Sequence, residues 1–162
     1  MAGSVTDTDR GFDKLAKQLA ELAGTPVSVL VGVHGERDSE MVVIAAANEY
    51  GTTHSGTGPG HNVPERSYLR STVDQGAGEI LDDLERAVDR TLAGGDLDQQ
   101  LGLVGEKWVG RVKTTIKELD TPANAASTIA AKRGTDNPLI DQGRLRNSIA
   151  KVIHKGATEV GP

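Results

Sequence analysis

The amino-acid sequence predicts an α+β fold in which a small, mostly antiparallel sheet packs against helices, including a long antiparallel helical hairpin. Two long stretches carry apolar residues at every third or fourth position, and a tight Gly-Gly turn joins them, which is typical of such a hairpin. A segment near the start alternates β-branched residues with a period of two, which favours a strand. A β-prone segment near the end favours a second strand of the same sheet.

Length and composition indicate one domain with an aliphatic core. A chain of 162 residues has the usual length of a single domain, and a chain of this size buries roughly 70% of its unfolded surface. Apolar residues make up 36% of the chain and aromatic residues only 2%, so the core must consist mainly of Val, Leu, Ile and Ala. We therefore expect one domain over residues 1–162, with a flexible amino terminus over residues 1–8. The small apolar content also predicts that neighbouring subunits contribute to stability.

The first third of the chain predicts a helix, a strand and a second helix. The strand covers Thr25–Val33, where valines occupy alternate positions. The Ala-rich segment Glu40–Asn48 predicts a short helix capped by Ser39, and a strand through Met41–Ile44 is the alternative. The first helix ends at Gly24, and its apolar positions are Phe12, Leu15, Ala16, Leu19 and Leu22.

The middle of the chain predicts a loop followed by the helical hairpin. Residues 52–62 are rich in Gly, Thr, Ser and His without periodicity, which is typical of a mobile loop. The helical pattern begins at Arg66, stops at Ala93–Asp96 and then resumes. The apolar stripe of the first long helix comprises Leu69, Val73, Ala77, Ile80, Leu84, Val88 and Thr91. The stripe of the second comprises Leu97, Leu101, Val104, Trp108, Val112, Ile116 and Leu119.

The last third predicts two short helices and the second strand. Ala125–Lys132 has the composition of a short helix that ends at Gly134. Asp141 is placed to cap one further helical turn that runs through Arg146. The segment Ile149–Ile153 is β-prone, and we expect it to join the sheet.

Charge and cysteine content narrow the function classes. The chain contains no cysteine, which excludes disulfide scaffolds and thiolate metal sites and suits assembly in a reducing cytoplasm. Its formal net charge is −5, whereas dedicated nucleic-acid binders are usually basic. No run of residues approaches the roughly 20 apolar positions that span a bilayer, so no membrane partner is expected.

Candidate catalytic and metal-binding patterns are weak. His54 and His61 with nearby Glu49 suggest a metal site, but their spacing matches no helix-face pair, which favours solvated loop histidines. The segment Gly56–Gly60 resembles a phosphate loop without its terminal Gly-Lys-Ser/Thr, and Pro59 removes a backbone donor. No serine lies in a Gly-x-Ser-x-Gly elbow. We therefore predict no catalytic, cofactor-binding or metal-binding residues, no cofactor, and a protein that is not an enzyme.

The segments with least apolar periodicity carry several basic residues. Arginine is the preferred charged residue at contacts between proteins. Ordinary surface salt bridges, a subunit interface and contacts to a DNA backbone all remain open for this set. Its members are Arg66, Arg70, Lys132, Arg133, Arg144 and Arg146.

Several stretches in a fixed order resemble a known group of proteins. They are Ala47–Thr52, Val63–Arg70, Ser127–Gly134 and Pro138–Ile149. Together these stretches, which span roughly residues 10–155, are similar to phage neck and tail-completion proteins, the families of HK97 gp10 and of the Mu-type virion morphogenesis proteins. Two departures stand out, because the loop through His61 is longer here and Ser67 replaces a common proline.

The resemblance implies a structural virion protein at the head–tail junction, assembled in the host cytoplasm. It implies a homohexameric ring, with a dodecamer as the alternative, between the head-closure or connector proteins and the tail-tube or terminator proteins. Genomic DNA would pass through this ring without sequence-specific binding. The expected packing anchors are Tyr50, Tyr68 and Leu69. The expected interface residues are Tyr50, Arg66, Tyr68, Arg70, Arg144 and Arg146.

Two other functions remain as alternatives. The first is a nucleic-acid-binding accessory protein that uses the arginine-rich last third of the chain. The second is a small metal-dependent hydrolase that uses Glu49, His54 and His61. Salt-dependent affinity for duplex DNA would favour the first, and stoichiometric zinc in the purified protein would favour the second.

Overall fold

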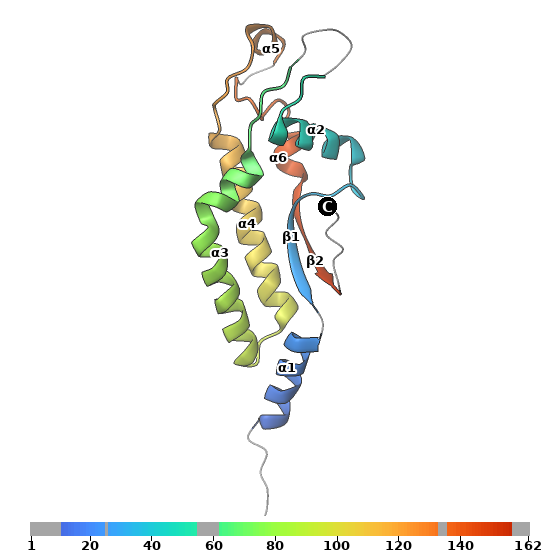
Figure 1. Cartoon of the computed structure of the whole chain (residues 1–162), viewed down its shortest axis with the longest axis vertical. Coiled ribbons are helices and arrows are strands. Elements are labelled where there is room, and N and C mark those ends of the chain that lie inside the picture. Colours follow the sequence, from blue (N-terminus) through green and yellow to red (C-terminus); the bar gives the residue numbers. More distant parts are fainter. Residues whose placement is uncertain (1–10, 25, 55–61, 133–135, 157–162) are drawn as a thin grey trace, which may run out of the picture.

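The computed structural model describes residues 11–24, 26–54, 62–132 and 136–156. In chain order the elements are α1 (Phe12–Gly24), β1 (Val27–Val33), α2 (Ser39–Tyr50), α3 (Tyr68–Leu92), α4 (Leu97–Glu118), α5 (Ala126–Ala131), α6 (Arg144–Ser148) and β2 (Ile149–Lys155). The predicted flexible terminus, residues 1–8, and most of the predicted loop, residues 55–61, lie outside the described residues. The α+β prediction is confirmed (Figure 1).

The sheet consists of β1 and β2, which pair antiparallel over their full length. The register runs from Val27 opposite Lys155 to Val33 opposite Ile149. Both strands lie along α4 (Figure 1). The strands approach this helix closely at Gly105, where an added Cβ would lie 2.8 Å from Lys151 Cδ and 3.0 Å from Val29 Cγ1. The glycine therefore sets how near the sheet can lie to the helix.

The long antiparallel hairpin of α3 and α4 is confirmed. Asp96 caps α4, because its carboxylate accepts the backbone N–H of Gln99 at 2.8 Å. The buried face of α4 matches the predicted stripe and includes Leu97, Leu101, Trp108, Val112 and Ile116. Leu97 and Leu101 belong to one core cluster, and Val112 and Ile116 belong to a second, toward the other end of the sheet.

The buried face of α3 is not the predicted apolar stripe. The residues that α3 buries are Tyr68, Thr72, Gly76, Asp83, Ala87 and Thr91. Of the predicted stripe only Thr91 is buried, while Val73 is 49% exposed. Small residues of α3 face α4 because the Trp108 ring of α4 fills the space between the two helices. A Cβ at Gly76 would lie 2.3 Å from Trp108 Cη2. The Trp108 indole also donates to Asp83 at 3.2 Å, which brings a buried carboxylate onto the same face.

The short helices form where they were predicted, but two caps differ. Asp38, not Ser39, caps α2, because its carboxylate accepts the N–H of Met41 at 3.0 Å. This helix replaces the alternative strand through Met41–Ile44. Gly143, with φ of 74°, precedes α6, so Asp141 does not serve as the cap. The prediction of α5 is confirmed, although its expected end at Gly134 lies outside the described residues.

No helix in the described part of the chain is long and apolar enough to cross a bilayer.

Candidate interaction surfaces

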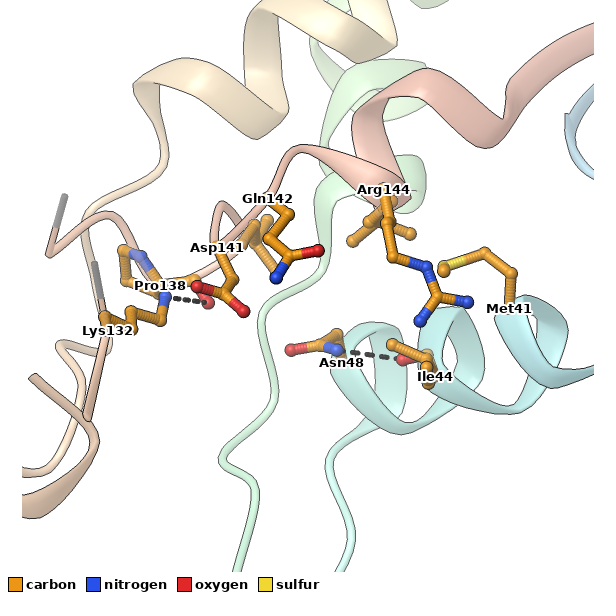
Figure 2. Close-up of a pocket in the computed structure, with 10 residues that line it drawn as sticks. Met41, Ile44, Asn48, Lys132, Pro138, Asp141, Gln142 and Arg144 are labelled. Carbon is orange, nitrogen blue, oxygen red and sulfur yellow. Dashed lines mark hydrogen bonds between the residues drawn. The ribbon is translucent and has the colours of Figure 1, made fainter. Parts of the chain in front are cut away.

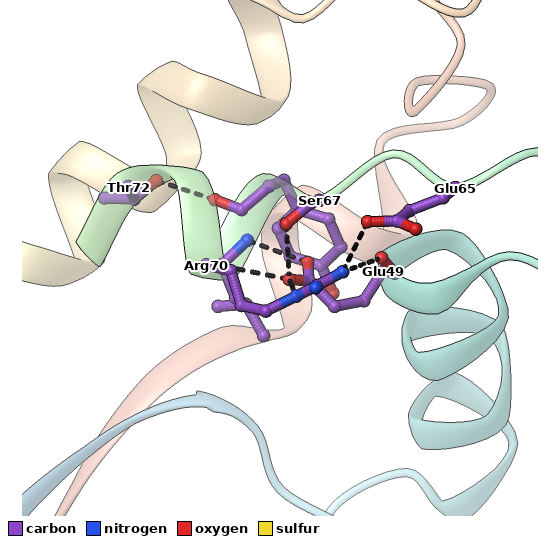
Figure 3. A network of polar contacts seen from close by, with 7 residues as sticks. Glu49, Glu65, Ser67, Arg70 and Thr72 are labelled. Carbon is purple, nitrogen blue, oxygen red and sulfur yellow. Dashed lines mark hydrogen bonds and ion pairs between the residues drawn. The ribbon is translucent and has the colours of Figure 1, made fainter. Parts of the chain in front are cut away.

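The first two stretches of the resemblance meet at one corner, where α2 ends and α3 begins (Figure 3). Glu49 is 1% exposed and stands at the start of α3. Its carboxylate accepts the backbone N–H groups of Leu69 at 2.8 Å and Arg70 at 3.0 Å, and the Ser67 hydroxyl at 3.1 Å. A carboxylate is stabilised there because the first N–H groups of a helix lack intrahelical partners and carry positive partial charge. Glu49 therefore acts as a cap for α3 from another helix.

Arg70 covers this carboxylate from the solvent side. Its guanidinium donates to the Glu49 carboxylate at 3.2 Å, to the Glu49 carbonyl at 3.0 Å and to the Glu65 carboxylate at 2.7 Å. The same guanidinium lies 5.0 Å from the centre of the Tyr50 ring. Ser67 takes part in this corner through its hydroxyl, which a proline at this position would lack. The corner is thus a closed network of polar contacts.

The backbone between α2 and α3 is held by two further features. Gly51 has φ of 71°, and an added Cβ would lie 2.8 Å from the Glu65 nitrogen, so only glycine fits without strain. Thr52 and Val63 form an isolated antiparallel bridge with two N–H to carbonyl bonds of 2.8 Å. The predicted loop over residues 52–62 is therefore fixed at its base.

Two of the six predicted interface residues are buried within the chain. Arg66 is 5% exposed and donates to the carbonyls of Pro122 at 2.8 Å and Ala123 at 3.3 Å. Tyr68 is fully buried in the main core cluster, and burial, ahead of the nearby Glu49 carboxylate, raises the pKa of its hydroxyl. The sequence around the start of a helix does not indicate whether an arginine there is buried or exposed.

The other four predicted interface residues are accessible. Tyr50 is 66% exposed, and the side chains of Arg70 and Arg144 are 48% and 53% exposed. Arg146 is also exposed, on α6. Arg144 pairs with Glu40 at 3.2 Å, so its charge is partly engaged within the chain. An interface role for these four residues stays a prediction.

The later stretches of the resemblance form a second corner against α2 (Figure 2). Lys132 donates to the carbonyls of Asn137 at 2.6 Å and Ile140 at 2.9 Å, and burial lowers its pKa. A cavity of about 220 Å³ lies between this segment and α2, with Met41 and Arg144 among its lining residues. The ammonium group of Lys132 therefore donates to backbone carbonyls, which leaves it few donors for a phosphate of a DNA backbone.

Of the residues of the hydrolase alternative, the structure describes Glu49 and His54. Glu49 is committed to the cap of α3. His54 is exposed and shares a 2.8 Å hydrogen bond with Thr53, and His61 lies outside the described residues. Within the described residues, no group of three or more His, Asp or Glu side chains is arranged to hold a metal ion.

An apolar groove lies between β1 and α3, with α4 as its floor. It encloses about 550 Å³, which is in the size range of binding sites. We call it the β1–α3 groove. Its lining includes Val29, Leu30, Val73, Ile80, Leu84 and Val104. Three of these side chains remain well exposed, namely Leu30 at 37%, Val73 at 49% and Leu84 at 36%. The displaced apolar stripe of α3 thus becomes one wall of an open groove.

Helix α1 carries the second exposed apolar surface. It lies beyond the turn that joins α3 and α4 (Figure 1). Its polar side faces the body, since Gln18 donates to the Thr91 carbonyl at 2.7 Å. Its apolar side faces outward, with Phe12 at 75%, Leu15 at 39% and Leu19 at 49% exposure. The predicted amphipathic helix is therefore present, and its apolar face is exposed to solvent.

Comparison of this chain with family models, with curated proteins and with solved structures found no match.

Proposed function

We propose that this chain is a structural subunit of a tailed-phage particle, located in the neck at the head–tail junction. In this role it forms a homo-oligomeric ring that joins the head connector to the tail and lets the genome pass. The observation that carries the proposal is the pair of exposed apolar surfaces, on α1 and in the β1–α3 groove. Exposed apolar side chains that gather on one face mark candidate sites of protein–protein contact.

The two corners support the same proposal. The sequence stretches that resemble neck proteins place their polar side chains in hydrogen bonds that fix the chain path, as Glu49 and Lys132 do. These side chains fix the shape of the subunit, and the exposed surfaces are available for contact with other subunits. The proposed activity is therefore the geometry of assembly.

A ring of copies explains why each subunit leaves apolar surface open. A cyclic ring uses one repeated contact between two different surfaces of the same chain, and each specific contact buries on the order of 1,000 Å² or more. We expect six copies, with twelve as the alternative. Six copies, each with a net charge of −5, give a ring charge of about −30. Acidic side chains along the channel would let DNA slide, because like charges repel; a basic channel in the assembled ring would contradict this.

The test of the proposal begins with the purified chain. Multi-angle light scattering and electron microscopy are expected to show a discrete ring, and a monomer at every concentration would contradict ring formation. Particles produced without the protein are expected to separate into filled heads and free tails. Intact infectious particles that lack the protein would overturn the proposed function.

A further inference from the structure

We infer that helix α1 of one copy docks its apolar face into the β1–α3 groove of a neighbouring copy. The inference rests on the proposed function and deepens it, because it names the contact that joins successive subunits. Its basis is that one chain presents both a convex apolar helix and a concave apolar groove.

The convex surface has the spacing that grooves recognise in helices. Phe12, Leu15 and Leu19 occupy positions i, i+3 and i+7 of α1 and share one face. A helix that lies in an apolar groove uses side chains at this spacing as anchors. The exposed fractions of Leu15 and Leu19, 39% and 49%, show that the body of the same chain does not cover this face.

The attachment of α1 favours a neighbouring copy over the groove of the same chain. Gln18 fixes the polar side of α1 to the last turn of α3 through the Thr91 carbonyl. Lys14 also lies against the turn after α3, since its Nζ is 2.8 Å from where a Cβ of Gly94 would stand. Seating α1 in its own groove would break both contacts. Docking in another copy keeps them and uses only the outward face.

The groove matches the helix in length and chemistry. The thirteen residues of α1 extend about 20 Å, and the seven residues of β1, which form one wall, extend about 23 Å. The opposite wall is the apolar stripe of α3, at Val73, Ile80 and Leu84. The outer edge of β1 pairs with no strand in the described part of the chain, so the groove stays open along this side.

The contact is heterologous, because it joins two different surfaces of the chain. In the head-to-tail arrangement of the proposed ring, each contact joins the helix of one subunit to the groove of the next, and the series either closes as a ring or continues as an open filament. Each subunit would give its helix to one neighbour and accept the helix of the other. This pattern distinguishes the inference from any symmetric pairing of exposed faces.

Single substitutions on each surface test the contact in the full-length protein. Leu19→Asp changes the helix and Leu84→Asp changes the groove; both side chains are partly exposed, so folding is retained and circular dichroism checks it. Each variant is expected to weaken self-association on the order of thirtyfold or more and to run as a monomer. Leu103→Asp is the matched control, because Leu103 is 55% exposed on α4 and does not line the groove. It is expected to assemble as the unmodified chain does.

A mixture of the two monomeric variants gives the decisive readout. One intact groove and one intact helix remain in each mixed pair, so Leu19→Asp with Leu84→Asp is expected to yield a discrete dimer and no larger species. Because the chain has no cysteine, Leu19→Cys and Leu84→Cys variants can be mixed and oxidised. The expected product is a covalent dimer that neither variant forms alone.

The outcomes separate this inference from the proposed function. If both Asp variants still form rings, another surface joins the subunits, and the inference fails while the ring proposal stands. If the variants are monomers but their mixture gives no dimer, the two surfaces do not contact each other, and the inference is again overturned. If the unmodified chain never assembles and particles are complete without it, both proposals fail.

Discussion

The corner around Glu49 and the β1–α3 groove use their side chains in opposite ways. At the corner, a carboxylate that is 1% exposed accepts four bonds from groups within the chain, and every contact is internal. In the groove, apolar side chains such as Val73 and Leu84 stay partly exposed although the chain has few apolar residues to spare. The comparison teaches that the chain satisfies the polar groups of this corner internally and leaves the apolar side chains of the groove partly exposed. The two regions should therefore respond differently to substitution, one in stability and the other in assembly.

The largest loss of stability is expected from Glu49→Gln. Leu69 and Arg70 donate to different oxygens of the Glu49 carboxylate, so the amide removes the charge and turns its NH2 toward one of these two N–H groups, which has no other partner at the helix start. We expect the free energy of unfolding to fall by about 3 kcal/mol, as for a buried charge network that loses one member. Urea unfolding measures this. Glu65→Gln, at the exposed rim, is the control and should have a much smaller effect, and equal effects would contradict the assigned cap.

A smaller loss is expected from Gly76→Ala in the seam between α3 and α4. The added Cβ would lie 2.3 Å from the Trp108 ring, which the surrounding core holds in place. Overpacking of this kind lowers the free energy of unfolding by about 2 kcal/mol. Gly78→Ala on the same helix has nothing within 4 Å of the added Cβ, so it should stabilise by about 0.8 kcal/mol through helix propensity. Thermal unfolding of the two variants should therefore shift in opposite directions.

Asp83 gives a prediction that depends on pH. Burial acts to raise the pKa of Asp83, but hydrogen bonds from Lys107, Arg86 and Trp108 outweigh it and lower the pKa below its ordinary value. A lowered folded-state pKa stabilises the protein above the unfolded-state pKa, and this contribution is lost as pH falls through the folded value, below about pH 4. The Asp83→Asn variant should lose less stability than the unmodified chain between about pH 5 and pH 3. Parallel acid-unfolding curves would contradict the assignment.

The smallest effect on stability is expected at the exposed residues of the predicted interface. Tyr50 is 66% exposed and Arg146 is exposed on α6, so Tyr50→Ala and Arg146→Ala should leave the unfolding midpoint almost unchanged. Light scattering then reports whether either residue contributes to self-association. A loss of assembly without a loss of stability would mean that the contact between subunits extends beyond the β1–α3 groove. A loss of stability would mean that these residues support the fold, as the residues of the Glu49 corner do.

Much of the fold follows from the sequence because period and turn chemistry are local properties. The valine alternation of β1, the Gly-Gly turn and the two long stripes predict the sheet and the hairpin that the structure contains. The face that α3 buries could not be predicted in this way, since apolar periodicity identifies one face of a helix but does not show which element packs against it. A second signal was present: Thr72, Gly76, Ala87 and Thr91 are small residues at helical spacing, opposite the single tryptophan.

The candidate surfaces were predicted less well than the fold. Arg66 and Tyr68 were expected at an interface but are buried. Arg66 bonds to the segment from Pro122 to Asn124, and Tyr68 packs in the main core cluster; no local pattern in the sequence predicts either contact. The groove was not predicted at all. It arises because the apolar stripe of α3 is turned away from α4, which is a property of tertiary packing.

Because of the bridge between Thr52 and Val63, the geometry of the chain on either side does not depend on how many residues the bridge encloses. Both strands of the bridge are tied by backbone bonds, so the entry to α3 has the same distance from the end of α2 whatever number of residues runs between them. Closing a longer loop costs only about 0.6 kcal/mol for each doubling of its length. An affinity epitope inserted between the two bridge residues is therefore expected to leave the unfolding midpoint of the chain almost unchanged.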